Sequence, residues 1–341
     1  MTDDPDPIPA LLISRLEDLG ERLGVDLVTP LGRRPKPVGR LLVDPSGFDA
    51  AREGLRTRGL DLSEVPGLDA AFAVPSDQRD ALLADPLVES GRVYVHGAAS
   101  QRAAELLGAQ PGEHVLDLAA APGGKTLVLA GAMQAQGRLV AVEPIRDRFY
   151  RLRANLDRTG NEWVETVRSD GRKLPSSFRS AFDRVLLDAP CSADVRIEPE
   201  DPETYRRWGL SKVRDLARKQ WGLLGAALWS LKPGGVAVYS TCTFAPEEDE
   251  AIVAAHLAES EGGKRGAAEV LDFDLGDGVR CVSGVSEFGK KRWPDAVTKT
   301  KRILPDELHE GFFVAKLRKI EVPDQRDGAG RRKASRRRGS R

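Results

Sequence analysis

Cysteine and histidine are scarce in this chain of 341 residues, which holds three cysteines and four histidines. The cysteine count is odd and no CxxC pair occurs, which argues against a disulfide framework and against a structural zinc site. No apolar run approaches the roughly 20 residues that a membrane-spanning helix needs, and the Asp-rich start MTDDPDPIPA is unlike a signal peptide. We therefore expect a cytoplasmic protein without a membrane partner.

A net charge is also lacking, since 52 basic residues balance 52 acidic ones. The balance hides an asymmetry, because residues 331–341 hold seven basic side chains and no acidic one. The other 330 residues carry a net charge of −7. A basic cluster on an acidic body is typical of proteins that bind a polyanion, although a solvated terminus would have the same composition.

Composition and hydrophobic periodicity divide the chain into four predicted regions. Residues 1–39 contain an amphipathic helix, ALLISRLEDLGERLG, and a Pro/Arg linker. Residues 40–90 have the pattern of a small α/β module. Residues 91–322 have the pattern of a larger α/β domain, the candidate for a catalytic domain once its motifs are considered, and residues 323–341 are predicted to be a disordered basic tail.

Strand and helix patterns alternate through the third region, which predicts an α/β fold with a mostly parallel sheet and helices on both faces. The helix that precedes Pro233 is expected to end in KPGG, and residues 262–302 are expected to be an insertion or loop. The segments RILP and GFFVAKLRK are expected to form a late strand pair. The strand candidates before that pair are residues 114–119, 138–143, 163–170, 182–190 and 236–242.

Acidic residues fall at the ends of four successive strand candidates: Asp117, Glu143, Asp170 and Asp188. Ligands of open α/β sheets bind at the carboxyl ends of the strands, and an acid after the second strand suits ribose hydroxyls. The turn AAAPGGKT follows the first strand and is neither a GxGxxG nor a P-loop motif, which disfavours NAD and ATP. Its small residues let the backbone approach a carboxylate at a helix N-terminus. A nucleoside joined to an amino acid describes S-adenosylmethionine.

Two of the three cysteines also follow strand candidates. Cys191 lies in LLDAPCS and Cys242 in YSTCT, so both can face one cleft with the acids. Cys281, in VRCVSG, is predicted to be a small buried hydrophobic residue without a chemical role.

The blocks DLAAAPGGKT, LLDAPCS and VAVYSTCT resemble the signature blocks of the Sun group of RNA cytosine-5 methyltransferases. The resemblance runs from about Gly91 to Lys319 and implies a Rossmann-like class I methyltransferase fold with S-adenosylmethionine as cofactor. It implies that the methionine end of the cofactor contacts Ala119, Ala120, Ala121, Pro122, Gly123, Gly124 and Lys125. It implies that Glu143 and Arg148 contact the ribose, that Asp170 and Gly171 contact the adenine, and that Asp188 lies between the cofactor and the target base.

The same resemblance implies catalytic roles for three residues. Cys242 would be the nucleophile, Cys191 would help to release the product, and Asp188 would contact the target base. A thiolate that adds to carbon 6 of cytosine turns the ring into an enamine whose carbon 5 can attack a methyl group. The target cytosine would be single-stranded or flipped out of its helix.

The chain departs from the family pattern at two places. It has His96-Gly97 where the family usually reads Gln-Asp or Gln-Glu, and Ser192-Ala-Asp-Val195 where the family often reads SGxG. A subgroup similar to mitochondrial rRNA and tRNA methyltransferases also lacks those glycines, so we expect a difference in substrate rather than lost catalysis. The module at 40–90 is similar to the small RNA-binding domain that precedes many members.

Two other functions are compatible with parts of the pattern. A DNA cytosine-5 methyltransferase would use the Pro-Cys cysteine as its nucleophile and would not need Cys242. A non-catalytic RNA-binding or ribosome-assembly factor would not need Cys191, Cys242 and Asp188 together. The expected substrate is therefore RNA, and the subgroup resemblance implies rRNA before tRNA. The expected protein is a monomer without a metal.

Two basic segments are candidates for RNA contact. Residues 289–302, GKKRWPDAVTKTKR, offer six basic side chains and Trp293, which suit phosphate contact and base stacking. A solvated loop with a partly buried Trp293 is the alternative. Deleting residues 331–341 is expected to weaken RNA binding at low salt and to flatten its salt dependence, with little change in turnover.

Overall fold

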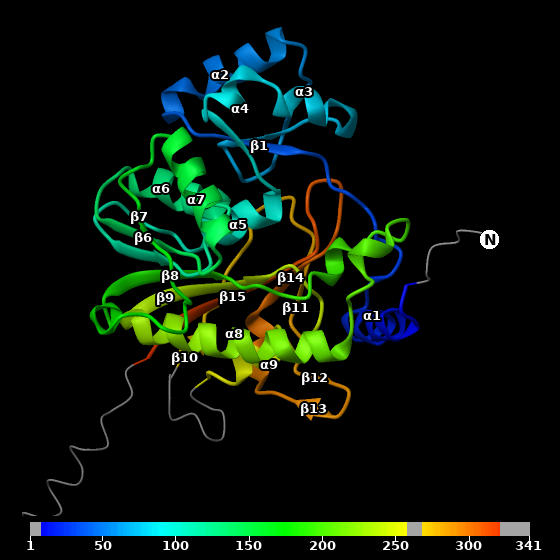
Figure 1. Ribbon diagram of the computed structural model, residues 1–341. Helices are drawn as coiled ribbons and strands as arrows, with labels where there is room; N and C mark the ends of the chain where they lie inside the picture. Colours follow the sequence, from blue (N-terminus) through cyan, green and yellow to red (C-terminus); the bar gives the residue numbers. More distant parts are fainter. Residues whose placement is uncertain (1–7, 258–267, 321–341) are drawn as a thin grey trace, which may run out of the picture.

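The computed structural model describes residues 8–257 and 268–320. A nine-stranded sheet forms the centre of the larger part of the molecule (Figure 1). Its strands run in the order β11-β14-β15-β9-β8-β5-β6-β7, and β10 pairs with β15. Strands β5 to β9 pair in parallel, whereas β15 runs antiparallel to β9 and to β14. The predicted mostly parallel α/β sheet is confirmed, and so is the late strand pair.

The strands of the large sheet lie close to the predicted positions. The third strand is shorter than expected, and β9 begins at Leu231, so the KPGG segment belongs to the strand and not to the helix end. The strands are β5 (His114–Asp117), β6 (Arg138–Val142), β7 (Glu165–Val167), β8 (Phe182–Asp188), β9 (Leu231–Thr241), β10 (Ala268–Val270), β11 (Cys281–Ser283), β14 (Lys301–Ile303) and β15 (Phe312–Lys319).

Helices cover both faces of this sheet, as the continuous apolar strands require (Figure 1). One core lies between the sheet and the helices α8 and α9, and a second lies between the sheet and α5, α6 and α7. The strands supply side chains to both cores because alternate residues face opposite sides. The helices are α5 (Ala98–Leu106), α6 (Gly124–Met133), α7 (Arg146–Arg158), α8 (Leu210–Ser230) and α9 (Glu250–Ala254).

A small antiparallel sheet in the order β2-β3-β1-β4 forms the N-terminal module at the top of Figure 1. It extends beyond the predicted limits of 40–90, because its first strand begins at Val38 and its last ends at Val95. Arg102 of α5 joins the module to the large sheet by donating to the carbonyls of Pro66 and Leu275. The elements are β1 (Val38–Leu41), α2 (Phe48–Thr57), β2 (Ser63–Glu64), β3 (Ala71–Ala73), α3 (Arg79–Leu83), α4 (Pro86–Glu89) and β4 (Val93–Val95).

Helix α1 (Ala10–Leu23) has the predicted bounds within one residue and packs against the larger part of the molecule. Its buried face, with Leu12, Leu16 and Leu19, shares a core with Ile197 and Phe244. Arg15 also pairs with Glu247 at 2.6 Å. The helix therefore supports the loops that follow β8 and β9. The division of the chain into domains stays a prediction, and the tail from residue 323 lies outside the described residues.

The segment predicted as a loop, residues 262–302, is only partly irregular. Its described part, residues 268–302, contains β10, β11, β12 (Glu287–Phe288) and β13 (Lys291–Arg292). The prediction for Cys281 is wrong, because this residue is exposed. It lies on the edge strand β11, where Val282 packs inward and its two neighbours alternate toward solvent.

The basic segment 289–302 does not present all six of its cations to solvent. Arg302 is completely buried in β14, where it pairs with Glu250 at 2.5 Å, so the expectation of phosphate contact is wrong for this residue. Lys299 pairs with Asp272 and Arg292 with Glu287. Trp293 is partly buried against two hydrophobic cores, which favours the alternative of a solvated loop with an anchored tryptophan.

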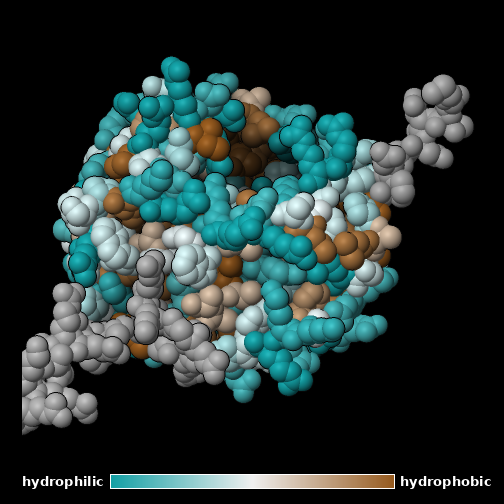
Figure 2. All heavy atoms as spheres, turned by 60° about the horizontal axis from the view of Figure 1, so that its bottom comes forward, coloured by the Kyte–Doolittle hydropathy of each residue, from teal (hydrophilic) through white to brown (hydrophobic). Residues whose placement is uncertain are grey.

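Hydrophilic residues cover most of the face drawn in Figure 2, and hydrophobic residues line a hollow in its upper part. Across residues 8–257 and 268–320, no helix combines the length and the apolar character that crossing a bilayer demands.

Candidate active site

The residues singled out from the sequence gather at one edge of the large sheet. Asp117 ends β5, Asp188 ends β8, and Glu143 directly follows β6. Cys191 and Cys242 lie just after β8 and β9, which are neighbours in the sheet. Because these strands are parallel, their carboxyl ends meet at the same edge.

The turn between β5 and α6 needs its two glycines for different reasons. Gly123 has a φ of +114°, a conformation that other residues rarely adopt. A Cβ on Gly124 would lie 3.0 Å from the Tyr94 ring and 3.1 Å from the His96 ring. The backbone of the turn is therefore packed closely under the segment that leads from the module into α5.

Asp117 is buried beneath this turn. One carboxylate oxygen accepts a bond from the Thr126 hydroxyl at 2.7 Å, and the other has no partner among the described residues. Burial raises the pKa of Asp117 to about 6, although the bond from Thr126 and the charge of Lys125 act against it. Asp117 thus keeps a buried oxygen with unused acceptor capacity beneath the turn.

Glu143 and Arg148 hold the same turn from the side of β6. The Glu143 carboxylate is buried and accepts a bond from the backbone of Ile145 at 2.8 Å. Arg148 donates to the carbonyl of Ala121 at 2.7 Å and lies 3.7 Å from the Glu143 carboxylate. A buried carboxylate at the end of the second strand is placed where a ribose is bound in open α/β sheets.

Asp170 follows β7 and is paired within its own turn. Its carboxylate contacts the Arg172 guanidinium at 2.6 Å, and this contact lowers the pKa of Asp170 to about 2. Gly171 has no space for a side chain, since a Cβ would lie 2.9 Å from Leu223 and 3.0 Å from Leu118. Tight packing against Leu118 and Leu223 is therefore sufficient to explain the glycine.

Asp188 lies at the centre of a cluster of polar side chains at the end of β8. Its carboxylate accepts bonds from Lys125 at 2.7 Å and from the Ser240 hydroxyl at 2.8 Å. Lys125 is buried and also donates to the hydroxyl of Ser100. Lys125 therefore contacts Asp188. It was predicted only to hold the methionine end of the cofactor.

The two strand-end cysteines face each other. The Sγ atoms of Cys191 and Cys242 lie 3.3 Å apart, and the Cys242 amide donates to the Cys191 sulfur at the same distance. The neighbouring Cys242 sulfur, together with burial, raises the pKa of the Cys191 thiol well above its ordinary value. In this arrangement Cys191 holds a proton that it can donate to Cys242.

Comparison with known proteins assigns a family to the chain. A family model described as "16S rRNA methyltransferase RsmB/F" matches residues 104–318, which include both cysteines and all four strand-end acids. The chain belongs to this family. The resemblance predicted from the three sequence blocks is confirmed.

Two curated relatives differ in their named substrates. The chain is 35% identical over 269 residues to "Ribosomal RNA small subunit methyltransferase F" of Vibrio atlanticus, covering 78% of this chain and 54% of the relative. It is 38% identical over 230 residues to "tRNA (cytosine(49)-C(5))-methyltransferase" of Pyrococcus abyssi, covering 67% and 71%. The chain thus spans about half the length of the ribosomal relatives it matches.

A solved structure supports the fold of this RsmB/F-family chain. It is described as a methyltransferase homolog protein from Pyrococcus horikoshii, with 26% sequence identity and a TM-score of 0.72. The superposition covers 91% of this chain and 95% of that one. The class I methyltransferase fold is confirmed.

The sequence reasoning missed Arg196 and Glu310 at the rim of the site. Arg196 donates to the Glu310 carboxylate at 3.0 and 3.1 Å. The negative charge of Cys242 raises the pKa of Arg196 further above its ordinary value, and Glu310 adds to the effect. Arg196 is therefore a fixed positive charge beside Cys242.

His96, one of the two departures from the family pattern, lies against the Gly123-Gly124 turn. Its Nδ1 atom is buried and has no partner among the described residues. Burial lowers the pKa of His96 well below its ordinary value, and the charges of Lys125, Arg40 and Arg196 act in the same direction. His96 is therefore a neutral imidazole at this site.

Glu248 holds the segment that carries Cys191. Its carboxylate accepts bonds from the Ser192 amide at 3.0 Å and from the Gln220 side chain at 2.7 Å. The same Gln220 group donates to the carbonyl of Pro190 at 2.9 Å. The peptide groups on both sides of Cys191 are thus bound by a fully buried pair of side chains.

A pH dependence of stability follows from Glu248. Burial raises its pKa to about 7 from an ordinary value of 4.5. The folded protein therefore binds a proton here more tightly than the unfolded chain, so the free energy of unfolding falls as the pH rises through about 7. Glu248→Gln keeps both hydrogen bonds and does not ionise. We expect wild type to lose about 2–3 kcal/mol relative to this variant between about pH 5 and about pH 8.

Urea unfolding of both proteins at the two pH values measures this difference, and every other titrating group cancels in the comparison. Parallel pH profiles of wild type and Glu248→Gln would show that Glu248 does not retain a proton in the folded state.

Proposed function

We propose that this protein transfers a methyl group from S-adenosylmethionine to carbon 5 of a cytosine in RNA, with Cys242 as the nucleophile. The observation that carries the proposal is the pair of thiols 3.3 Å apart, beside the Asp188–Lys125 pair, at the end of two neighbouring parallel strands. Membership of the RsmB/F family supports it.

The residues at the ends of β5, β6 and β7 fit S-adenosylmethionine. The unpartnered oxygen of Asp117 suits the ammonium group of an amino acid. The turn from Ala119 to Gly124, with Lys125, stays the predicted contact of the methionine end. Glu143 suits the two ribose hydroxyls, with Arg148 holding the turn beside it. Asp170 and Gly171 stay the predicted adenine contacts. When bound, the cofactor supplies an electrophilic methyl group.

The two cysteines have different roles in the covalent chemistry on the cytosine ring. The Cys242 thiolate adds to carbon 6, and the electrons of the 5,6 double bond make carbon 5 nucleophilic. After methylation, a water molecule takes the proton from carbon 5, and the electrons of that carbon–hydrogen bond re-form the 5,6 double bond. At the same time the bond from sulfur to carbon 6 breaks, and its electron pair leaves with the Cys242 sulfur. Cys191 keeps its proton because of its raised pKa and can deliver it to the Cys242 sulfur that leaves.

Asp188 is proposed to bind the polar edge of the target base. Its carboxylate is held by Lys125 and Ser240 and keeps about a third of its side-chain surface exposed, 32%. The amino group of cytosine can donate to such a carboxylate, and the ring nitrogen can donate to it once it carries a proton in the covalent adduct. The proposed substrate is rRNA before tRNA, and both kinds of RNA occur in the names of relatives.

The direct test uses purified protein, methyl-labelled S-adenosylmethionine and total RNA from a strain that lacks the gene. Nucleoside analysis after digestion should show the label in 5-methylcytidine, and duplex DNA should stay unlabelled. Label in DNA alone would favour a DNA methyltransferase, and no label in either would favour a non-catalytic RNA-binding factor. Bisulfite sequencing of the same RNA would then locate the cytosine.

A further inference from the structure

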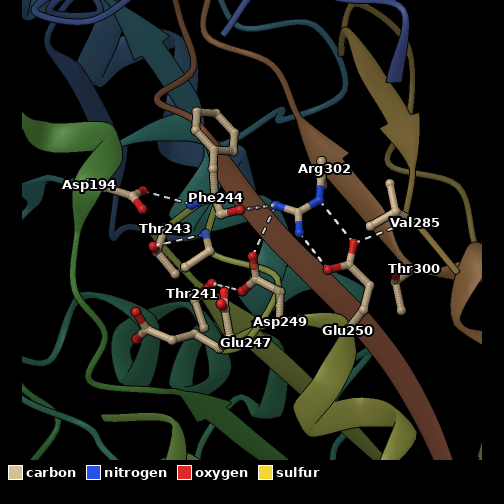
Figure 3. A network of polar contacts seen from close by, with 12 residues as sticks. Asp194, Thr241, Thr243, Phe244, Glu247, Asp249, Glu250, Val285, Thr300 and Arg302 are labelled. Carbon is tan, nitrogen blue, oxygen red and sulfur yellow. Dashed lines mark hydrogen bonds and ion pairs between the residues drawn. The ribbon is translucent and has the colours of Figure 1, made fainter. Parts of the chain in front are cut away.

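The loop after β8 is bound side by side to the loop after β9. We call residues 189–196 the Cys191 loop and residues 242–249 the Cys242 loop. Besides the contact between the two sulfurs, the Ser192 hydroxyl lies 2.8 Å from that of Thr243. The Asp194 carboxylate accepts a bond from the Phe244 amide at 2.7 Å (Figure 3). The three contacts therefore follow one another in the same order along both loops.

Asp194 lies in an environment where a carboxylate is costly. Only 3% of its surface is exposed, and burial raises its pKa while the bonds from Phe244 and Thr243 act against this. The preceding residue, Ala193, has a φ of +58°, in the left-handed region that favours glycine. The loop therefore adopts a strained conformation that brings a buried carboxylate onto the Phe244 amide.

The Phe244 peptide is held on its other side as well. Arg302 donates to the Phe244 carbonyl at 3.3 Å, and Arg302 is itself fixed by Glu250 at 2.5 Å (Figure 3). Before Cys242, the Thr241 hydroxyl donates to Asp249 at 2.6 Å. The residues on both sides of Cys242 are thus bound to buried side chains, and Asp194, like Ser192, comes from the Cys191 loop.

We propose that Asp194 is a positioning residue for Cys242, which holds the Cys242 loop so that its sulfur stays opposite Cys191. The proposal rests on the proposed function for its catalytic meaning, although the position of the sulfur can be measured without it. Asp194 lies in the stretch Ser192–Val195, where this chain departs from the SGxG pattern. The departures from that pattern are Ala193 and Val195, and Asp194 takes the variable position between them.

The test compares Asp194→Ala with Asp194→Asn. The alanine variant leaves the Phe244 amide without its acceptor, and a misplaced nucleophile is expected to lower kcat by about 10–100-fold, with KM for RNA and for S-adenosylmethionine unchanged. The asparagine oxygen can still accept from the Phe244 amide, so this variant is expected to regain most of the rate. Should Asp194→Ala fail to fold, Asp194→Ser serves in its place, since its shorter side chain does not reach the amide.

A second readout does not depend on methylation. Alkylation of the free protein by iodoacetamide is followed at each cysteine by peptide mass spectrometry. In Asp194→Ala, the rate at Cys242 is expected to rise at least about threefold because the loosened loop exposes the sulfur, while the rate at the exposed Cys281 stays constant. Asp194→Asn is expected to react like wild type.

Asp183→Ala is the matched control. Asp183 also accepts a backbone bond, from His114 at 2.9 Å, but it lies at the opposite edge of the same sheet. This variant is expected to lower the melting temperature without changing kcat or the alkylation of Cys242. If Asp194→Ala behaves in the same way, Asp194 is only structural and the proposal is overturned. If wild type methylates no RNA, the proposed function fails, and the alkylation rates alone decide on Asp194.

Discussion

Cys242→Ala is expected to abolish methyl transfer and to leave the binding of S-adenosylmethionine intact. Removing a covalent nucleophile lowers turnover by roughly 10⁴-fold or more, because the low-barrier route through the adduct is lost. The residues proposed to hold the cofactor follow other strands, and Cys242 is not among them. Turnover with labelled cofactor and calorimetric binding of the cofactor measure the two effects separately.

Cys281→Ala is the matched control for this result, because Cys281 is exposed on the edge strand β11. It should methylate at the wild-type rate. Normal turnover by Cys242→Ala would end the assignment of the nucleophile, and loss of cofactor binding would mean that the substitution disturbs the whole site.

Cys191→Ala is expected to trap a covalent complex between protein and RNA that survives a denaturing gel. The reason is that the thiol 3.3 Å from the Cys242 sulfur is the proposed proton donor for release. Without it, the bond from sulfur to carbon 6 breaks slowly and the adduct accumulates. A gel shift with labelled RNA, in the presence of S-adenosylmethionine, measures the trapped fraction.

The double variant Cys191→Ala/Cys242→Ala should form no adduct, since it lacks the nucleophile. If instead Cys242→Ala traps the adduct and Cys191→Ala does not, the roles of the two cysteines are reversed. The chain would then use the mechanism of the DNA enzymes, with the Pro-Cys cysteine as nucleophile.

The sheet and the strand-end residues could be predicted from the sequence because they depend on local patterns. Continuous apolar strands between helices indicate a parallel sheet, and the carboxyl ends of parallel strands share one edge. Asp117, Glu143 and Asp188 therefore came together as expected.

The errors concern residues whose environment depends on distant partners. Arg302 belongs to a basic segment in the sequence, but its strand lies between two others and its carboxylate partner is 52 positions away. Cys281 was predicted wrongly because its side chain lies on the side of β11 that faces solvent, and the sequence does not show which strand lies at the edge of the sheet. Glu248 and Asp194 were missed for the same reason, since each acts through a backbone amide of another loop.

The central claim is that the Cys242 sulfur bonds to a cytosine of RNA. RNA that carries 5-fluorocytidine tests it most directly, because carbon 5 then has no proton to lose after methylation and the adduct cannot resolve. Wild-type protein, this RNA and S-adenosylmethionine should give a stable complex, and mass spectrometry of its peptides should place the nucleotide on Cys242. A nucleotide on Cys191, or no complex with an RNA that is methylated in its unmodified form, would contradict the account.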